Sequence, residues 1–257
     1  MSTIGVLLKK DLMEQTRSKK VLILAAIFTF LAVVSPISAK LLPELVKSLS
    51  GQSGIVITVP EATFINSIDQ FVKNTSQLVI FVLIFVVAGA VSDEKTRKTL
   101  ELVLVKPVSR TSFVLSKFAA YFLTISLSFF ASALVCYFYT ASIFESFSLV
   151  NFLMVATLTL IYVLLVIAAT IFVSTIAKSA AVAGVIGLLS SFVFSSIPGL
   201  FSATADYSPG YILSHYPELI LKGWDAKFMP PAALSIALIA VFIIGAVVVF
   251  KGQEVER

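Results

Sequence analysis

Hydrophobic residues in this chain are gathered into long runs that shorter polar segments separate. A helix that crosses the hydrocarbon core of a membrane needs about 20 predominantly apolar residues. We expect six runs to form such helices, and they cover residues 21–39, 74–91, 113–144, 152–177, 179–201 and 232–250. The pattern therefore predicts an all-α polytopic membrane protein in which residues 1–257 form a single transmembrane domain.

Composition supports a membrane environment and argues against a soluble one. Hydrophobic residues make up 58% of the chain and charged residues 13%, whereas soluble domains carry about a quarter of their residues charged. The net charge of +5 does not indicate nucleic-acid binding, because the basic residues stand at the ends of the apolar runs. We expect the lipid bilayer, and not nucleic acid, to be a partner.

The basic residues also predict an orientation. Residues 1–20, the loop at 92–117, Lys178 and the tail after 250 carry 14 of the 19 Lys and Arg residues. Basic residues are concentrated in cytoplasmic loops, so this charge bias predicts a multi-pass protein of the cell membrane with both termini in the cytoplasm.

An amphipathic helix is expected before the first span. Four apolar residues recur there at helical spacing, and four charged residues lie elsewhere around the helix: Ile4, Leu7, Leu8 and Leu12, and Lys9, Lys10, Glu14 and Arg17. The pattern is typical of a helix that lies on the inner membrane surface with basic residues near anionic lipid. A helix that simply leads into the first span fits it equally well.

The outer segments at 40–76 and 202–231 have no decisive pattern. In the first, a short extended piece or hairpin is compatible with the Val/Ile/Thr run at 55–59. The second carries aromatic residues typical of the membrane–water boundary: Tyr207, Tyr211, Tyr216 and Trp224.

Small residues mark one face of the fifth span. They recur every four residues and allow another helix to approach closely: Ala183, Gly187, Ser191 and Ser195. Packing within one subunit, contact between subunits and lining of a transport pathway all remain open.

Catalytic and metal-binding patterns are not found in the sequence. Cys136 is the only cysteine and lies in an apolar run, and His215 is the only histidine and lies in a polar loop. There is no Gly-rich phosphate-binding loop. We expect a chain that is not itself an enzyme and that binds no metal or cofactor.

The polar segment at 92–117 is the strongest candidate for a functional element. It holds nine charged residues, whereas residues 118–177 hold one, Glu145. Ser92 is expected to cap a short cytoplasmic helix between spans 2 and 3, and Pro107 to end it near Val105. The second half of this helix is apolar, so it packs on the bundle or enters a groove on a partner.

This segment resembles the cytoplasmic loop of type-2 ABC transporter permeases. The resemblance rests on Glu94, Thr99, Leu100, Glu101, Leu104, Pro107, Val108, Ser109 and Arg110, with Lys117 opening the next span. Lys98 departs from the pattern because the family usually has Gly there. The six spans, the amphipathic N-terminal helix and the aromatic outer segment extend the resemblance over most of the chain.

The resemblance implies a half-transporter. Two permease subunits pair, here as a homodimer, and each engages a separate ATPase subunit, which binds ATP and Mg²⁺, through a coupling helix in the loop. It implies an exporter in which these residues dock the ATPase: Glu94, Leu100, Glu101, Pro107 and Arg110.

Three other classes of protein are alternatives. An ion-coupled secondary transporter would carry ionisable residues within its spans, and an intramembrane enzyme would carry a catalytic set at membrane depth. Neither is evident in the sequence. A membrane scaffold or assembly subunit without transport activity would share all the features above. The apolar spans are compatible with lipids, hydrophobic peptides or drugs as cargo.

Overall fold

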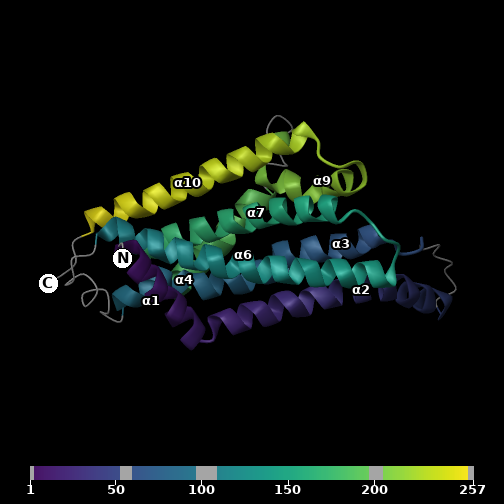
Figure 1. Ribbon diagram of the computed structural model, residues 1–257, viewed down its shortest axis with the longest axis horizontal. Coiled ribbons are helices and arrows are strands. Elements are labelled where there is room, and N and C mark those ends of the chain that lie inside the picture. Colours follow the sequence, from purple (N-terminus) through teal and green to yellow (C-terminus); the bar gives the residue numbers. More distant parts are fainter. Residues whose placement is uncertain (1–2, 53–59, 97–108, 197–204, 254–257) are drawn as a thin grey trace.

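The computed structural model describes residues 3–52, 60–96, 109–196 and 205–253, and all regular elements in these ranges are helical (Figure 1). The long helices run side by side along one axis (Figure 1). In chain order the α-helices are α1 (Thr3–Arg17), α2 (Lys20–Gln52), α3 (Phe64–Lys73), α4 (Ile80–Thr96), α6 (Arg110–Ile143), α7 (Leu149–Ile176), α8 (Ala180–Ser196), α9 (Pro209–Lys222) and α10 (Met229–Gly252). The all-α prediction is confirmed.

Five of the predicted spans are helices long and apolar enough to cross a membrane. They cover residues 20–48, 64–96, 110–143, 149–176 and 226–252. The remaining predicted span, 179–201, corresponds to α8, which has 17 described residues. At about 1.5 Å per residue the described part of α8 is shorter than the hydrocarbon core is thick, so the count of six spans stays a prediction.

The second span is longer than its apolar run suggested. A π-helical segment, Asn74–Val79, joins α3 to α4, and the amide of Ile80 donates to the carbonyl of Thr75. The continuous helix starts at Phe64, where Thr63 and Asn66 form a capping box. Within the part that extends beyond the apolar run, charged Lys73 pairs with Asp69 one turn earlier, at 2.7 Å.

The outer segments are also helical where they are described. Helix α2 continues past Pro36 and Pro43 to Gln52, and the run at 55–59 lies outside the described residues. Tyr211 and Tyr216 of α9 are buried in the bundle, while Tyr207 and Trp224 are exposed. The Tyr216 hydroxyl donates to Asp69 at 2.6 Å. Burial and this hydrogen bond raise the pKa of Tyr216 above its usual range.

Helix α7 occupies the centre of the bundle. It packs against α4, α6, α8, α9 and α10. The most apolar stretch of α7 is 78% buried inside the bundle, whereas that of α10 is 17% buried. The helix α1 and the C-terminal end of α10 lie at the same end of the bundle, whereas α9 lies towards the other end (Figure 1).

Candidate functional site

The segment before the polar loop does not begin a new helix. Helix α4 continues through Ser92 to Thr96, and Ser92 is fully buried, with its hydroxyl donating to the carbonyl of Ala88 at 3.0 Å. The expectation that Ser92 caps a separate helix is therefore wrong, because nothing interrupts the backbone pattern of α4 there. The rest of the predicted coupling helix, residues 97–105, lies outside the described residues.

Lys117 is the buried centre of a charged cluster that joins three helices. The cluster consists of Lys10, Asp11 and Glu14 from α1, Glu94 from α4 and Lys117 from α6. The Lys117 ammonium hydrogen-bonds the Glu94 carboxylate and lies 2.9 Å from Oδ1 of Asp11. Its side chain is 5% exposed. A lysine buried this deeply requires carboxylates around it, since an unpaired charge there is strongly unfavourable.

Lys10 completes the charged cluster from its solvent side. Its ammonium donates to Oε1 of Glu94 at 2.9 Å and lies 3.9 Å from Oε2 of Glu14. The cluster thus sets three carboxylates against two ammonium groups. Because Glu94 stands near the end of α4 and Lys117 near the start of α6, the cluster holds both sides of the polar loop to α1.

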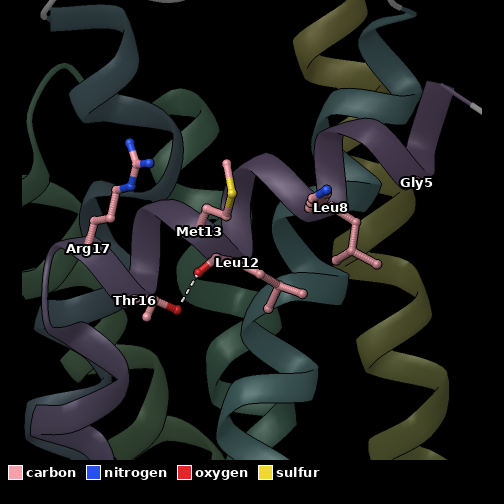
Figure 2. A pocket seen from close by; sticks show the side chains of 7 residues that line it. Gly5, Leu8, Leu12, Met13, Thr16 and Arg17 are labelled. Atoms are coloured by element: carbon pink, nitrogen blue, oxygen red, sulfur yellow. Dashed lines mark hydrogen bonds between the residues drawn. The ribbon is translucent and has the colours of Figure 1, made fainter.

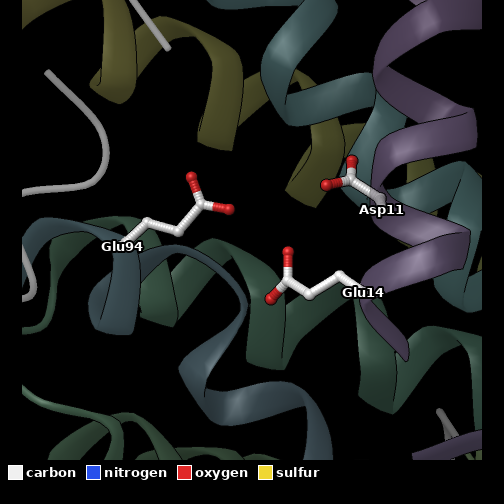
Figure 3. A group of neighbouring side chains, drawn as sticks. All are labelled: Asp11, Glu14 and Glu94. Carbon is white, nitrogen blue, oxygen red and sulfur yellow. The ribbon is translucent and has the colours of Figure 1, made fainter. Parts of the chain in front are cut away.

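Three carboxylates close together raise the question of a metal site. Oxygens of Asp11, Glu14 and Glu94 lie within 4.8 Å of one another, and Figure 3 shows the three side chains converging on one space. Lys117 lies within 3.6 Å of an oxygen of each of the three acids. The ammonium supplies the positive charge that a cation would bring, so we interpret the cluster as an ion-pair network.

Helix α1 packs on α6 through polar side chains as well. The Ser116 hydroxyl donates to Oδ2 of Asp11 at 2.8 Å, and the Thr124 hydroxyl donates to Oε1 of Gln15 at 2.7 Å. The side of α1 that faces the bundle is thus formed by Leu7, Asp11 and Gln15, all buried. The sequence pattern predicted the helix correctly but did not predict this polar packing side.

The end of α4 is attached to α7 by a buried serine. The Ser174 hydroxyl donates to the carbonyl of Ala88 at 2.6 Å and accepts from the amides of Val91 and Ser92 at 3.1 Å. One turn later the Lys95 ammonium donates to the carbonyl of Thr175. The side chain amide of Gln253 donates to the same carbonyl at 2.7 Å, which brings in the end of α10.

The start of α6 is attached to the end of α10 by Arg110. Its Nη1 lies 3.2 Å from the carbonyl oxygen of Phe250, 2.8 Å from that of Lys251 and 2.5 Å from that of Gln253. The last carbonyls of a helix have no partners within the helix, and a cation at this end is also favoured by the helix dipole. Arg110 therefore ties the residue after the loop to the last helix.

The predicted ATPase-docking residues are divided between described and undescribed parts of the chain. Glu94 belongs to the charged cluster and Arg110 to the contact with α10, whereas Leu100, Glu101 and Pro107 lie outside the described residues. Docking stays a prediction for all five residues. For Glu94 and Arg110, the structure adds a role in positioning the two ends of the loop.

Sequence reasoning missed Asp11 and Ser174 as members of this arrangement. The sequence did offer a signal for Asp11, because this residue interrupts the apolar face of α1 one turn after Leu7. Lys117 appeared in the loop motif, but its burial did not follow from the motif. Ser174 gave no signal, because serines in apolar helices commonly bond their own backbone.

The small-residue face of α8 packs inside the same chain. Ala183 and Gly187 are buried, and a Cβ on Gly187 would lie 2.9 Å from both Ile84 of α4 and Thr170 of α7. Ser191 accepts a hydrogen bond at its carbonyl from the Tyr162 hydroxyl at 3.1 Å. The backbone of Ser195 lies against Gly210 of α9. All four positions thus approach other helices of this subunit.

Comparison with known proteins identifies the class of this chain. Residues 6–255 match the model of the ABC-2 family transporter proteins, so the protein belongs to that family, and the resemblance drawn from the polar loop is confirmed. It is a membrane subunit of the ABC transporter class, not a catalytic one. The chain is 26% identical over 251 residues to the "Uncharacterized transmembrane protein YxlG" of Bacillus subtilis (strain 168). The alignment covers 94% of this chain and 96% of the relative.

Proposed function

We infer that this chain is the permease subunit of an ATP-driven exporter of the cell membrane, with both termini in the cytoplasm. Two copies pair, and each engages a separate ATPase that binds ATP and Mg²⁺. The observation that supports this function most is the position of the charged cluster: it joins α1 to the helices on both sides of the polar loop.

The attachments at the loop ends suggest how force would be transmitted. An ATPase that pushes on residues 97–108 would move the end of α4 and the start of α6 together, since Lys117 bonds Glu94 directly. Helix α1 would follow through Asp11, and α10 would follow through Arg110. A displacement at the loop would thereby reach α1 and the second, third and last spans.

Charge reversal at Glu101 tests this function. We expect Glu101→Lys to weaken ATPase binding and ATP-dependent transport by about tenfold or more, as expected for a docking contact of more than about 1.4 kcal/mol. Melting of the isolated subunit should not change. Binding is measured with the purified ATPase, and transport in vesicles that contain both subunits.

Two further variants make the result specific. Lys222→Glu changes an exposed charge at the end of α9 and should leave both readouts unchanged. Adding Arg110→Glu to Glu101→Lys should abolish coupling, although this second change also disturbs α10. Unchanged ATPase binding and transport in the double variant would refute the docking assignment and favour a scaffold without transport activity.

A further inference from the structure

The outward side of α1 is unusually apolar for the end of a membrane bundle. The side that faces the bundle is centred on Asp11 and Gln15, whereas Val6 and Met13 point away from it and are 55% and 46% exposed. The usual arrangement for a helix on a protein surface is the reverse, with the apolar stripe facing the core. This polarity suits a helix whose outward side meets lipid.

An open groove of about 430 Å³ runs along this outward side. It is lined by Gly5, Leu8, Lys9, Leu12, Met13, Thr16 and Arg17. Figure 2 shows Gly5 towards one end of the helix and Arg17 at the other, with Leu8, Leu12 and Met13 between them. The lining thus combines apolar side chains with two cations, Lys9 and Arg17.

The two cations of the groove differ from their neighbour Lys10. Lys10 turns towards the bundle and pairs with Glu94. Among the residues that the structure describes, neither Lys9 nor Arg17 has an ion pair or a side-chain hydrogen bond, and both are exposed. Their charges are therefore available to an anion from outside the subunit.

The position of the groove in the chain favours a membrane lipid as that anion. Lys19 adopts a left-handed conformation with φ of 59°, which turns the chain sharply between α1 and α2. Helix α2 then presents Leu22 and Ile23, which are 65% and 43% exposed, from the first turn of a candidate span. The groove thus lies next to the start of a lipid-facing surface.

We propose that this groove binds an anionic phospholipid of the adjoining leaflet. Lys9 and Arg17 pair with its phosphate and headgroup, while Leu8, Leu12 and Met13 contact the upper part of its acyl chains. Basic residues near a membrane surface strengthen the attraction to anionic lipid by about fivefold each. The site does not depend on the proposed ATPase coupling, because none of its lining residues belongs to the charged cluster.

A fluorescent reporter in the groove tests the proposal. Trp224 is the only tryptophan and lies beyond α9, so Trp224→Phe combined with Met13→Trp leaves one indole, in the groove. The full chain is reconstituted into phosphatidylcholine vesicles that contain brominated phosphatidylglycerol or brominated phosphatidylcholine. We expect the brominated anionic lipid to quench the indole several-fold more strongly at equal mole fraction, and added salt to reduce the difference.

Charge-matched variants of the reporter identify the groups responsible. Lys9→Gln with Arg17→Gln should abolish the preference for the anionic lipid, whereas Lys178→Gln with Lys251→Gln, two exposed lysines beside the ends of the polar loop, should preserve it. Equal quenching by the two lipids, or a preference that survives K9Q/R17Q, would overturn the proposal. If aqueous iodide quenched the indole and neither brominated lipid did, the proposal would also be overturned. The groove would then be open to the cytoplasm and its proteins, and not to lipid.

A second measurement does not need the reporter. Native mass spectrometry of the otherwise unchanged chain should detect retained phosphatidylglycerol, and K9Q/R17Q should lower its occupancy by about tenfold or more, given about fivefold per cation. The same occupancy in this variant and in the parent chain would contradict the proposed site.

Discussion

Replacing Lys117 by methionine is expected to destabilise the protein by about 3–5 kcal/mol, the usual cost of removing one partner from a buried ion pair. Asp11 is 3% exposed and Glu94 is 7% exposed, so removing Lys117 leaves two buried carboxylates with Lys10 as their remaining cation. Thermal unfolding of the purified subunit measures the effect. Lys73→Met is the matched control, because its pair with Asp69 is exposed and should contribute less than about 1 kcal/mol.

Neutralising the acids should reverse most of this loss. In K117M combined with Asp11→Asn and Glu94→Gln no buried charge is left unpaired, and a neutral network can be as stable as the ionic one. Recovery of the unfolding temperature is the expected result. A triple variant as unstable as K117M, or K117M as stable as the parent chain, would show that the charged cluster does not hold α1, α4 and α6 together.

Replacing Arg110 by methionine is expected to loosen the end of α10. Three carbonyls lose a charged donor, and a hydrogen bond to a charged group contributes about 1.5–3 kcal/mol. Amide hydrogen exchange in the last turns of α10, residues 246–253, should accelerate by about tenfold to a hundredfold, since exchange reports local opening. Lys251→Met removes the same charge from an exposed side chain of that turn and should leave exchange unchanged. Unchanged exchange in R110M would mean that Arg110 does not hold α10.

The sequence predicted the helices better than their contacts. Apolar runs define the transmembrane helices because lipid requires every backbone group to be satisfied within a helix or barrel. Their ends were harder to predict: α2 passes two prolines, and α3 starts before the apolar run, at a capping box formed by Thr63 and Asn66. In each case the helix continues through residues that the sequence pattern marks as helix boundaries, namely the two prolines of α2 and Lys73.

The candidate site was only partly predictable for a related reason. The loop motif drew attention to Glu94 and Arg110 as docking residues and to Lys117 as the residue that opens the next span. It contained no information about α1, which is more than 70 residues earlier in the chain, so the pairing of Lys117 with Asp11 was not foreseeable. Buried polar contacts of this kind depend on which helices are neighbours, and helical periodicity does not specify that.

The proposed function requires that residues 97–108 of this permease contact a separate ABC ATPase. Site-specific photocrosslinking tests it most directly: a photoreactive residue replaces Glu101 in the full chain in cells, and the crosslinked protein is identified by mass spectrometry. We predict a crosslink to an ATPase with a phosphate-binding loop, and no such crosslink when the photoreactive residue replaces Lys222 near the other end of the bundle. The absence of an ATPase crosslink from position 101 would contradict this function. Equal ATPase crosslinking from position 222 would contradict it as well.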